Sequence, residues 1–109
     1  MIGKNQIGEL NIHPMRSLAP QFLKDNAALP GGLDKFGLGF ALNSKAVAKG
    51  RSANTMAWAG VFNTFFWIDR GSKVCAVLMT QMSPFMEDGA EKLLQDFDRA
   101  VYASLHKGQ

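Results

Sequence analysis

The alternation of hydrophobic and polar positions in the second half of the chain predicts an antiparallel sheet. The apolar stretch at residues 56–69 has the pattern of a strand, and residues 73–81 have the pattern of another. The polar segment 69–72 between them reads as a turn, so these two strands would pair as an antiparallel hairpin. A further strand is predicted upstream at residues 36–42, although its two glycines weaken it.

The end of the chain has the pattern of a helix over residues 88–106. Its apolar side chains recur every four residues, at Leu93, Phe97, Val101 and Leu105. Asp88 and Glu91 have the spacing of a capping box in which an aspartate is the cap. Pro20 can begin a shorter helix that runs to about residue 28. These elements predict an α+β fold, with an antiparallel sheet of three or more strands and the C-terminal helix packed on one face.

The predicted strand at residues 56–69 is apolar on both of its faces. One face carries Trp58, Phe62, Phe66 and Ile68, and the other carries Val61, Phe65 and Trp67. A strand that is apolar on both sides needs cover on both sides, and one helix supplies only one layer. We therefore expect one aromatic set to stay exposed and the chain to associate with a partner or with a second copy of itself.

Composition and charge narrow the classes of protein to which the chain can belong. The 109 residues suit one small domain, and the net charge of +3 is scattered, with Lys45, Lys49 and Arg51 as the nearest thing to a cluster. Such a basic loop is typical of solvated surface, so no nucleic-acid partner is expected. No apolar run has the length of a membrane span, which favours a soluble protein, cytoplasmic or periplasmic.

Metal and disulfide chemistry find little support in the sequence. The single cysteine, Cys75, excludes an intrachain disulfide and a cysteine metal cluster, and its apolar surroundings predict a buried, inert thiol. His13 and His106 have no acidic or cysteine partner at ligand spacing. The sequence therefore predicts neither a metal site nor a cofactor.

The ordered set of elements resembles a known family. The run from Trp58 to Asp69 (WAGVFNTFFWID) looks like the strand that ends the active-site wall of serine β-lactamases, and VLMTQ at residues 77–81 looks like the next strand. DKFGLGF at residues 34–40 and the terminal helix match in place and pattern. The chain thus resembles the serine β-lactamase and penicillin-binding-protein-like hydrolases, above all the esterase and amide-hydrolase relatives of class C β-lactamases. The resemblance implies that residues 1–109 form a single partial domain, the C-terminal part of a β-lactamase/transpeptidase-like fold.

This resemblance also implies a set of site residues. Trp58, Ala59 and Gly60 stand where the family has its Lys-Thr-Gly motif, and would bind substrate. An indole in place of the lysine favours ester or amide substrates over carboxylate-bearing β-lactams. The family match further makes the backbone N–H of Val61 a candidate donor to the oxyanion hole, a role in which its side chain takes no part.

The family's nucleophile has no counterpart in this chain. The family needs a Ser-x-x-Lys motif and a Tyr-x-Asn-type motif upstream of the strand that carries Trp58. Ser104 to Lys107 fits Ser-x-x-Lys literally, and Tyr102 to Ser104 is close to the second motif, but both follow the strand. Ser104 would also lie at the C-terminal end of a helix, where the helix dipole disfavours a developing anion.

Two classes of function remain open on the sequence alone. The chain is either a C-terminal portion of a serine hydrolase, inactive until an N-terminal part completes it, or a non-catalytic α+β module for dimerisation or ligand binding. The first reading predicts a small ester or amide substrate once the domain is complete. A Ser-x-x-Lys motif encoded in the same reading frame upstream of Met1 would decide for the first reading.

Overall fold

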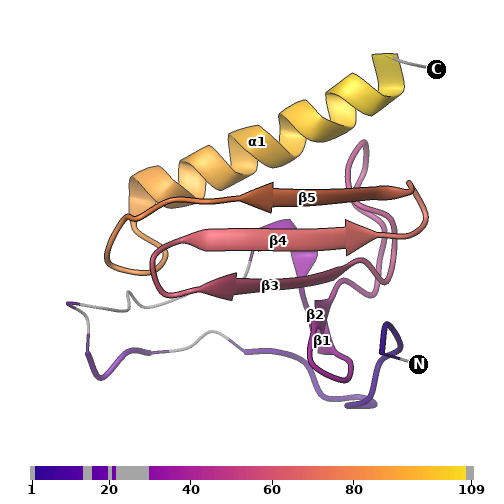
Figure 1. Cartoon of the computed structure of the whole chain (residues 1–109). Helices are drawn as coiled ribbons and strands as arrows, with labels where there is room; N and C mark the ends of the chain where they lie inside the picture. Colours follow the sequence, from indigo (N-terminus) through magenta and orange to yellow (C-terminus); the bar gives the residue numbers. More distant parts are fainter. Residues whose placement is uncertain (1, 14–15, 20, 22–29, 108–109) are drawn as a thin grey trace.

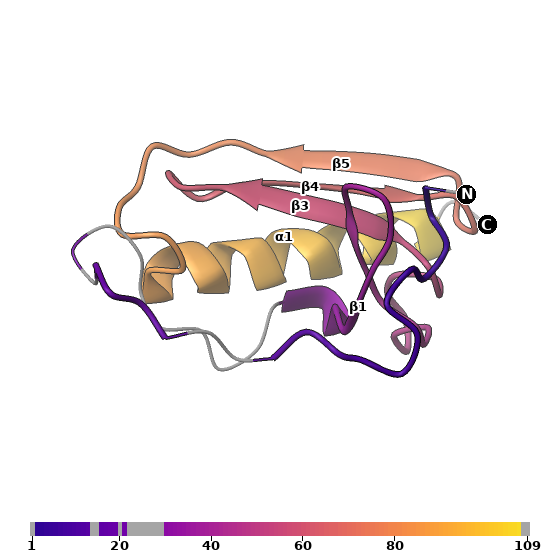
Figure 2. The ribbon, with the colours of Figure 1, turned by 90° about the horizontal axis from the view of Figure 1, so that it is seen from below.

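The computed structural model describes residues 2–13, 16–19, 21 and 30–107, and has one sheet with one helix across a face (Figures 1 and 2). A short 3-10 turn at Pro30–Gly32 precedes the strands β1 (Lys35–Phe36), β2 (Ala41–Leu42), β3 (Met56–Gly60), β4 (Thr64–Asp69) and β5 (Val74–Leu78), and the helix α1 (Asp88–Lys107). The strands lie in the order β1-β2-β3-β4-β5, and every neighbouring pair is antiparallel. The predicted α+β architecture is confirmed.

The prediction of one continuous strand over residues 56–69 is wrong. A turn at residues 61–63 divides this stretch into β3 and β4, and the N–H of Asn63 donates to the carbonyl of Gly60 at 3.1 Å. Asn63 has a φ of 63°, a left-handed conformation that asparagine tolerates better than most residues. Its buried side chain donates to the carbonyls of Met82 and Pro84 and accepts from the N–H of Met86. The turn is therefore held by an amide whose partners lie far along the chain.

The predicted strand at residues 36–42 is divided in the same way. Gly37 donates to the carbonyl of Phe40 at 2.8 Å, and Gly39 has a φ of 100°, which a residue with a side chain rarely adopts. The glycines that weakened the strand in the sequence thus form the β1–β2 turn. The β4–β5 turn at residues 69–72 is confirmed, and Lys73 at its end has a positive φ of 58°. The short helix predicted from Pro20 lies outside the described residues.

Helix α1 covers one face of the sheet and forms the core with it. The buried cluster draws Ala57, Phe65, Trp67 and Ala76 from the sheet, Leu94 and Tyr102 from the helix, and Met86 from the segment before the helix. At the start of this helix the side chain of Glu87 accepts from the N–H groups of Gly89 and Ala90, at 3.0 Å each. No helix in the described part of the chain is both long and apolar enough to span a membrane.

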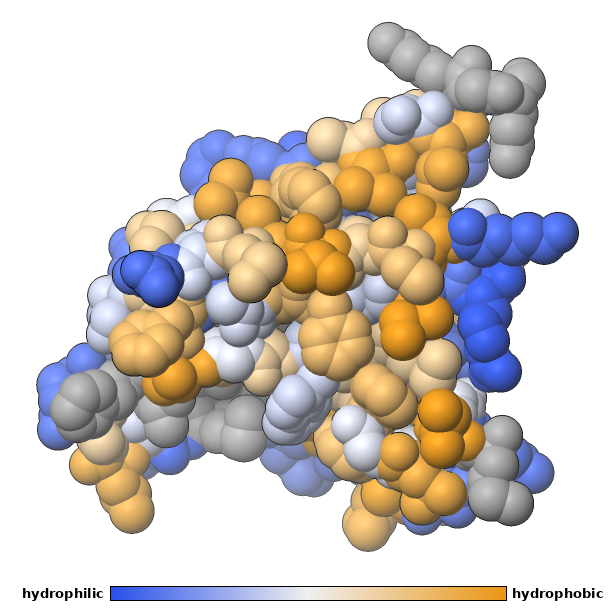
Figure 3. All heavy atoms as spheres, viewed as in Figure 1, coloured by the Kyte–Doolittle hydropathy of each residue, from blue (hydrophilic) through white to orange (hydrophobic). Residues whose placement is uncertain are grey.

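The opposite face of the sheet is apolar and largely open. Trp58 pairs with Phe66 across β3 and β4, and Phe66 pairs with Val77 of β5, so these three side chains share that face. Trp58 is 49% exposed and Val77 is 61% exposed, and Figure 3 shows apolar side chains gathered over the strands on this side. Phe36 and Phe40 cover part of the face, with edge-on contacts to Trp58 and Phe66.

Cys75 also belongs to this open face, because it lies two residues before Val77 in β5 and alternate residues of a strand share a face. The prediction of a buried thiol is therefore wrong, and the cysteine is exposed. An apolar run does not reveal which of its two faces will be covered, and here the helix covers the face that carries Ala76.

Candidate functional site

The outer edge of β3 is open where the sequence places the candidate site. Strand β4 pairs with all five residues of β3, whereas β2 pairs only with Met56 and Ala57. Among the described residues, no strand lies against Trp58, Ala59 and Gly60 on that side. Alternate residues of an antiparallel strand direct their N–H and C=O groups to opposite sides. The carbonyl of Gly60 accepts from Asn63 in the turn to β4, so Gly60 directs its backbone groups to β4 and the preceding residue, Ala59, directs its own to the open edge.

Val61 continues this edge as the first residue of the β3–β4 turn. It is 46% exposed, and its backbone N–H has no acceptor among the described residues. A free N–H beside an open strand edge is what an oxyanion donor requires. The role itself stays a prediction.

The three residues predicted to bind substrate, Trp58, Ala59 and Gly60, have different environments. The indole of Trp58 stands edge-on to Phe36, with ring centres 5.5 Å apart, and its N–H has no acceptor among the described residues. Ala59 faces the helix side and pairs with Phe65. Gly60 is fixed by packing, because any side chain there would collide with the hydroxyl of Thr64. Glycine at this position thus has a structural cause in addition to any role in admitting a ligand.

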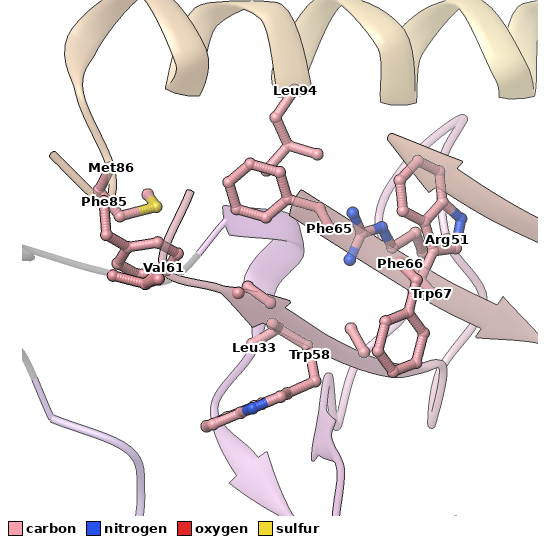
Figure 4. Close-up of a pocket in the computed structure, with 13 residues that line it drawn as sticks. Leu33, Arg51, Trp58, Val61, Phe65, Phe66, Trp67, Phe85, Met86 and Leu94 are labelled. Atoms are coloured by element: carbon pink, nitrogen blue, oxygen red, sulfur yellow. The ribbon is translucent and has the colours of Figure 1, made fainter. Parts of the chain in front are cut away.

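A cavity of about 310 Å³ opens beside this edge (Figure 4). It is lined by Leu33, Arg51, Ala57, Trp58, Ala59, Gly60, Val61, Phe65, Phe66, Trp67, Phe85, Met86 and Leu94. The rim residues Trp58 and Val61 are about half exposed, whereas Phe65, Met86 and Leu94 at the floor are buried. The four candidate residues from the sequence, 58–61, therefore line one cavity together.

Much of the cavity comes from residues that the sequence analysis did not select. Leu33 precedes β1, Phe85 and Met86 precede the helix, and Leu94 lies nearly two turns into it. Leu94 is not part of the predicted fourfold repeat, whose first member, Leu93, is 44% exposed. Nothing in the sequence signals that these segments meet at β3.

Arg51 was expected to be a solvated loop cation, and this expectation is wrong. It is only 3% exposed, and its guanidinium carbon lies 4.2 Å from the centre of the Trp67 ring. Its Nε donates to Asp98 of α1 at 3.0 Å, which ties the loop before β3 to the helix. Burial lowers the pKa of Arg51 and raises that of Asp98, while the attraction between the two groups opposes both shifts. Lys45 and Lys49 are exposed, as expected.

A chain of buried hydrogen bonds continues behind the cavity. The indole N–H of Trp67 donates to the hydroxyl of Tyr102 at 3.0 Å, and this hydroxyl donates to Asp69 at 2.8 Å. Burial by itself would raise the pKa of Asp69. The N–H groups of Ser52 and Ser72 and the Tyr102 hydroxyl outweigh it and lower the pKa to about 2. Burial, together with the bond to Asp69, raises the pKa of Tyr102 far above its ordinary range.

This network excludes Tyr102 as a base for the literal Ser-x-x-Lys sequence. The Tyr102 side chain is buried between α1 and the sheet, and its hydroxyl already donates to the carboxylate of Asp69. Ser104 is exposed on another side of α1, as predicted. No described residue hydrogen-bonds to the Ser104 hydroxyl, and none activates it. Within the described ranges, no group of three His, Cys, Asp or Glu side chains is arranged to hold a metal ion.

Comparison with known proteins finds likeness in structure only. No protein-family model matches the chain, and no curated protein does. Two solved structures that match are mutants of simvastatin synthase (LovD) from Aspergillus terreus, each 24% identical, with TM-scores of 0.65 and 0.63. Each match covers 67% of this chain, but only 19% and 18% of the respective LovD chains. The chain therefore has a partial LovD-like fold.

Proposed function

We propose that this chain forms one wall of the active site of a β-lactamase-like serine hydrolase that acts on ester or amide substrates. The nucleophile would come from polypeptide outside these 109 residues. The observation that carries the proposal is the open edge of β3 at residues 58–61, which lies beside an apolar cavity. The likeness to about a fifth of the LovD chain supports it, because most of a complete domain of that type is then still to be supplied.

The chemistry assigned to this wall is binding and charge stabilisation. An extended substrate segment can pair with the free N–H and C=O groups of Ala59 at the open edge. The N–H of Val61 would then donate to the oxyanion that develops when a serine attacks the substrate carbonyl, an interaction worth about 3 kcal/mol in the transition state. Trp58 offers a half-exposed aromatic surface and an indole N–H with no acceptor among the described residues, which suit a neutral substrate better than an anionic one.

The isolated chain is expected to show no acyl-serine chemistry. It should neither hydrolyse p-nitrophenyl esters above the background rate nor react with a fluorophosphonate probe, because the chain has no Ser-x-x-Lys motif upstream of β3, where the family places its serine and the base that activates it. Ser104 is the residue to monitor by mass spectrometry, with a Ser104→Ala variant as the matched control. Stoichiometric labelling that disappears in the Ser104→Ala variant would contradict the assignment of the nucleophile to another polypeptide.

The second candidate function is a non-catalytic module for dimerisation or ligand binding. The open sheet face favours it, because Trp58, Val77 and Met79 are 49%, 61% and 77% exposed there. Exposed apolar surface of this kind is common where a protein meets a partner. The missing part of a hydrolase domain would cover the same face, so the open face alone does not separate the two functions.

The purified chain is expected to self-associate. At micromolar concentration, sedimentation velocity should detect a dimer or larger species, together with binding of an apolar dye, because exposed apolar surface favours association. A Val77→Asp variant places a charge on the open face and should shift the population towards monomer and reduce dye binding. A compact monomer that binds no dye would contradict the need for a covering partner.

A further inference from the structure

The cavity beside β3 combines apolar walls with one buried cation at its inner end. Figure 4 shows the Arg51 guanidinium between Phe65 and Trp67, while Val61 and Trp58 lie at the other side of the cavity. A concave apolar site with very few polar groups is the usual form of a small-molecule site, and those few polar groups orient the ligand.

The size of the cavity limits its occupant. Its volume is about 310 Å³, at the lower end of the range of about 300–1,000 Å³ for small-molecule sites, so a small ligand of about ten non-hydrogen atoms suits it. The buried side chains of Phe65, Met86 and Leu94 offer such a molecule no polar partner. Most of the ligand must therefore be apolar.

Arg51 determines what the inner end of the ligand carries. A guanidinium has five N–H bonds, and only the one at Nε has an acceptor among the described residues, Asp98. Arg51 is only 3% exposed, yet every fully buried side-chain nitrogen in the described part of the chain has a hydrogen-bond partner. The terminal N–H groups are therefore in contact with accessible space, and the cavity that Arg51 lines provides it.

The charges around Arg51 favour a neutral ligand. Asp98 lies 3.0 Å from Nε, and Asp69 also acts on the guanidinium electrostatically. One cation thus already faces two carboxylates in a buried site, where an additional negative charge would be costly to desolvate. A carbonyl or ether oxygen accepts a hydrogen bond without adding charge.

We propose that this cavity binds a neutral, mainly apolar molecule of about ten non-hydrogen atoms, with a hydrogen-bond acceptor that meets Arg51. The identity of the ligand, as the apolar group of an ester or amide substrate, rests on the proposed function. Binding itself needs no nucleophile, so the isolated chain is sufficient for the test.

The test compares three probes of matched size, 2-nonanone, octanoate and decane, each of about ten non-hydrogen atoms. The two tryptophans of the chain, Trp58 and Trp67, both line the cavity, so tryptophan emission reports its occupancy. We expect saturable binding of 2-nonanone, about tenfold tighter than that of octanoate or decane. Arg51→Met, which keeps the length of the stem, should reduce the affinity for the ketone about tenfold.

Two further variants keep the test decisive if Arg51→Met does not fold. Ala59→Phe should fill the cavity and abolish ketone binding, whereas Val77→Ser on the open face should leave it unchanged. No saturable signal, octanoate binding as tight as the ketone, or binding that survives Ala59→Phe would each overturn the inference. None of these results bears on the hydrolase proposal, which depends on the polypeptide that carries the nucleophile.

Discussion

Replacing Trp67 with alanine is expected to lower the free energy of unfolding by about 4 kcal/mol. The side chain is 1% exposed, stacks on Tyr102 and meets Phe97 edge-on. Its loss would also leave the Arg51 guanidinium without the ring beneath it and the Tyr102 hydroxyl without its donor. A small domain has only about 5–15 kcal/mol of stability in total. Urea unfolding followed by far-ultraviolet circular dichroism measures the change.

Trp58 provides the matched control for this experiment. It has the same side chain on the neighbouring strand, but it is 49% exposed and its aromatic contact is to Phe36 on the open face. Trp58→Ala is therefore expected to cost about 1 kcal/mol or less. Equal losses for the two variants would mean that the helix does not cover the face that carries Trp67.

Asp69 is expected to make the chain sensitive to acid. Its pKa is lowered from 3.8 to about 2 in the folded protein, and this difference corresponds to about 2 kcal/mol of stability. Because the folded pKa lies below the unfolded one, this contribution is fully present above about pH 4 and is lost as the pH falls towards 2. The free energy of unfolding of the wild type should therefore decrease steeply between pH 5 and pH 2.

An Asp69→Asn variant separates this effect from the other titrations. The variant should be less stable than the wild type at pH 7, and the difference between the two should narrow by about 2 kcal/mol towards pH 2. Burial raises the pKa of Asp98, so its titration changes stability in the opposite direction, but both proteins share it. A difference that stays constant with pH would show that Asp69 does not titrate as an ion held by the N–H groups of Ser52 and Ser72.

Hydrophobic periodicity predicted the layers of this fold better than its turns. The turn at residues 61–63 escaped detection because two of its three residues are apolar and it has neither glycine nor proline. Because the turn has three residues, even-numbered positions of β3 and β4 lie on the same face, so Trp58 and Phe66 share a face, as predicted. The exposure of Cys75 depends on which face of the sheet α1 covers. The burial of Arg51 depends on its ion pair with Asp98, which lies 47 positions away in the sequence. Neither is encoded in a local pattern.

The candidate site was predictable only as a stretch of strand. Residues 58–61 stand out because of their order within the family-like run, and the structure brings them to one open edge beside a cavity. The cavity itself needs Leu33, Met86 and Leu94 from three separate segments, so no spacing along the chain reveals it. The substrate roles of Trp58 to Val61 stay predictions.

The reading frame upstream of Met1 tests the proposed hydrolase function. If this chain is the wall of a serine hydrolase site, sequencing the upstream DNA should find a Ser-x-x-Lys motif in the same frame, followed by a Tyr-x-Asn-type motif before Met1. Expression of that longer polypeptide should then give fluorophosphonate labelling at the motif serine. An in-frame stop codon just upstream of Met1, with neither motif before it, would contradict the hydrolase assignment and leave the non-catalytic module as the function to pursue.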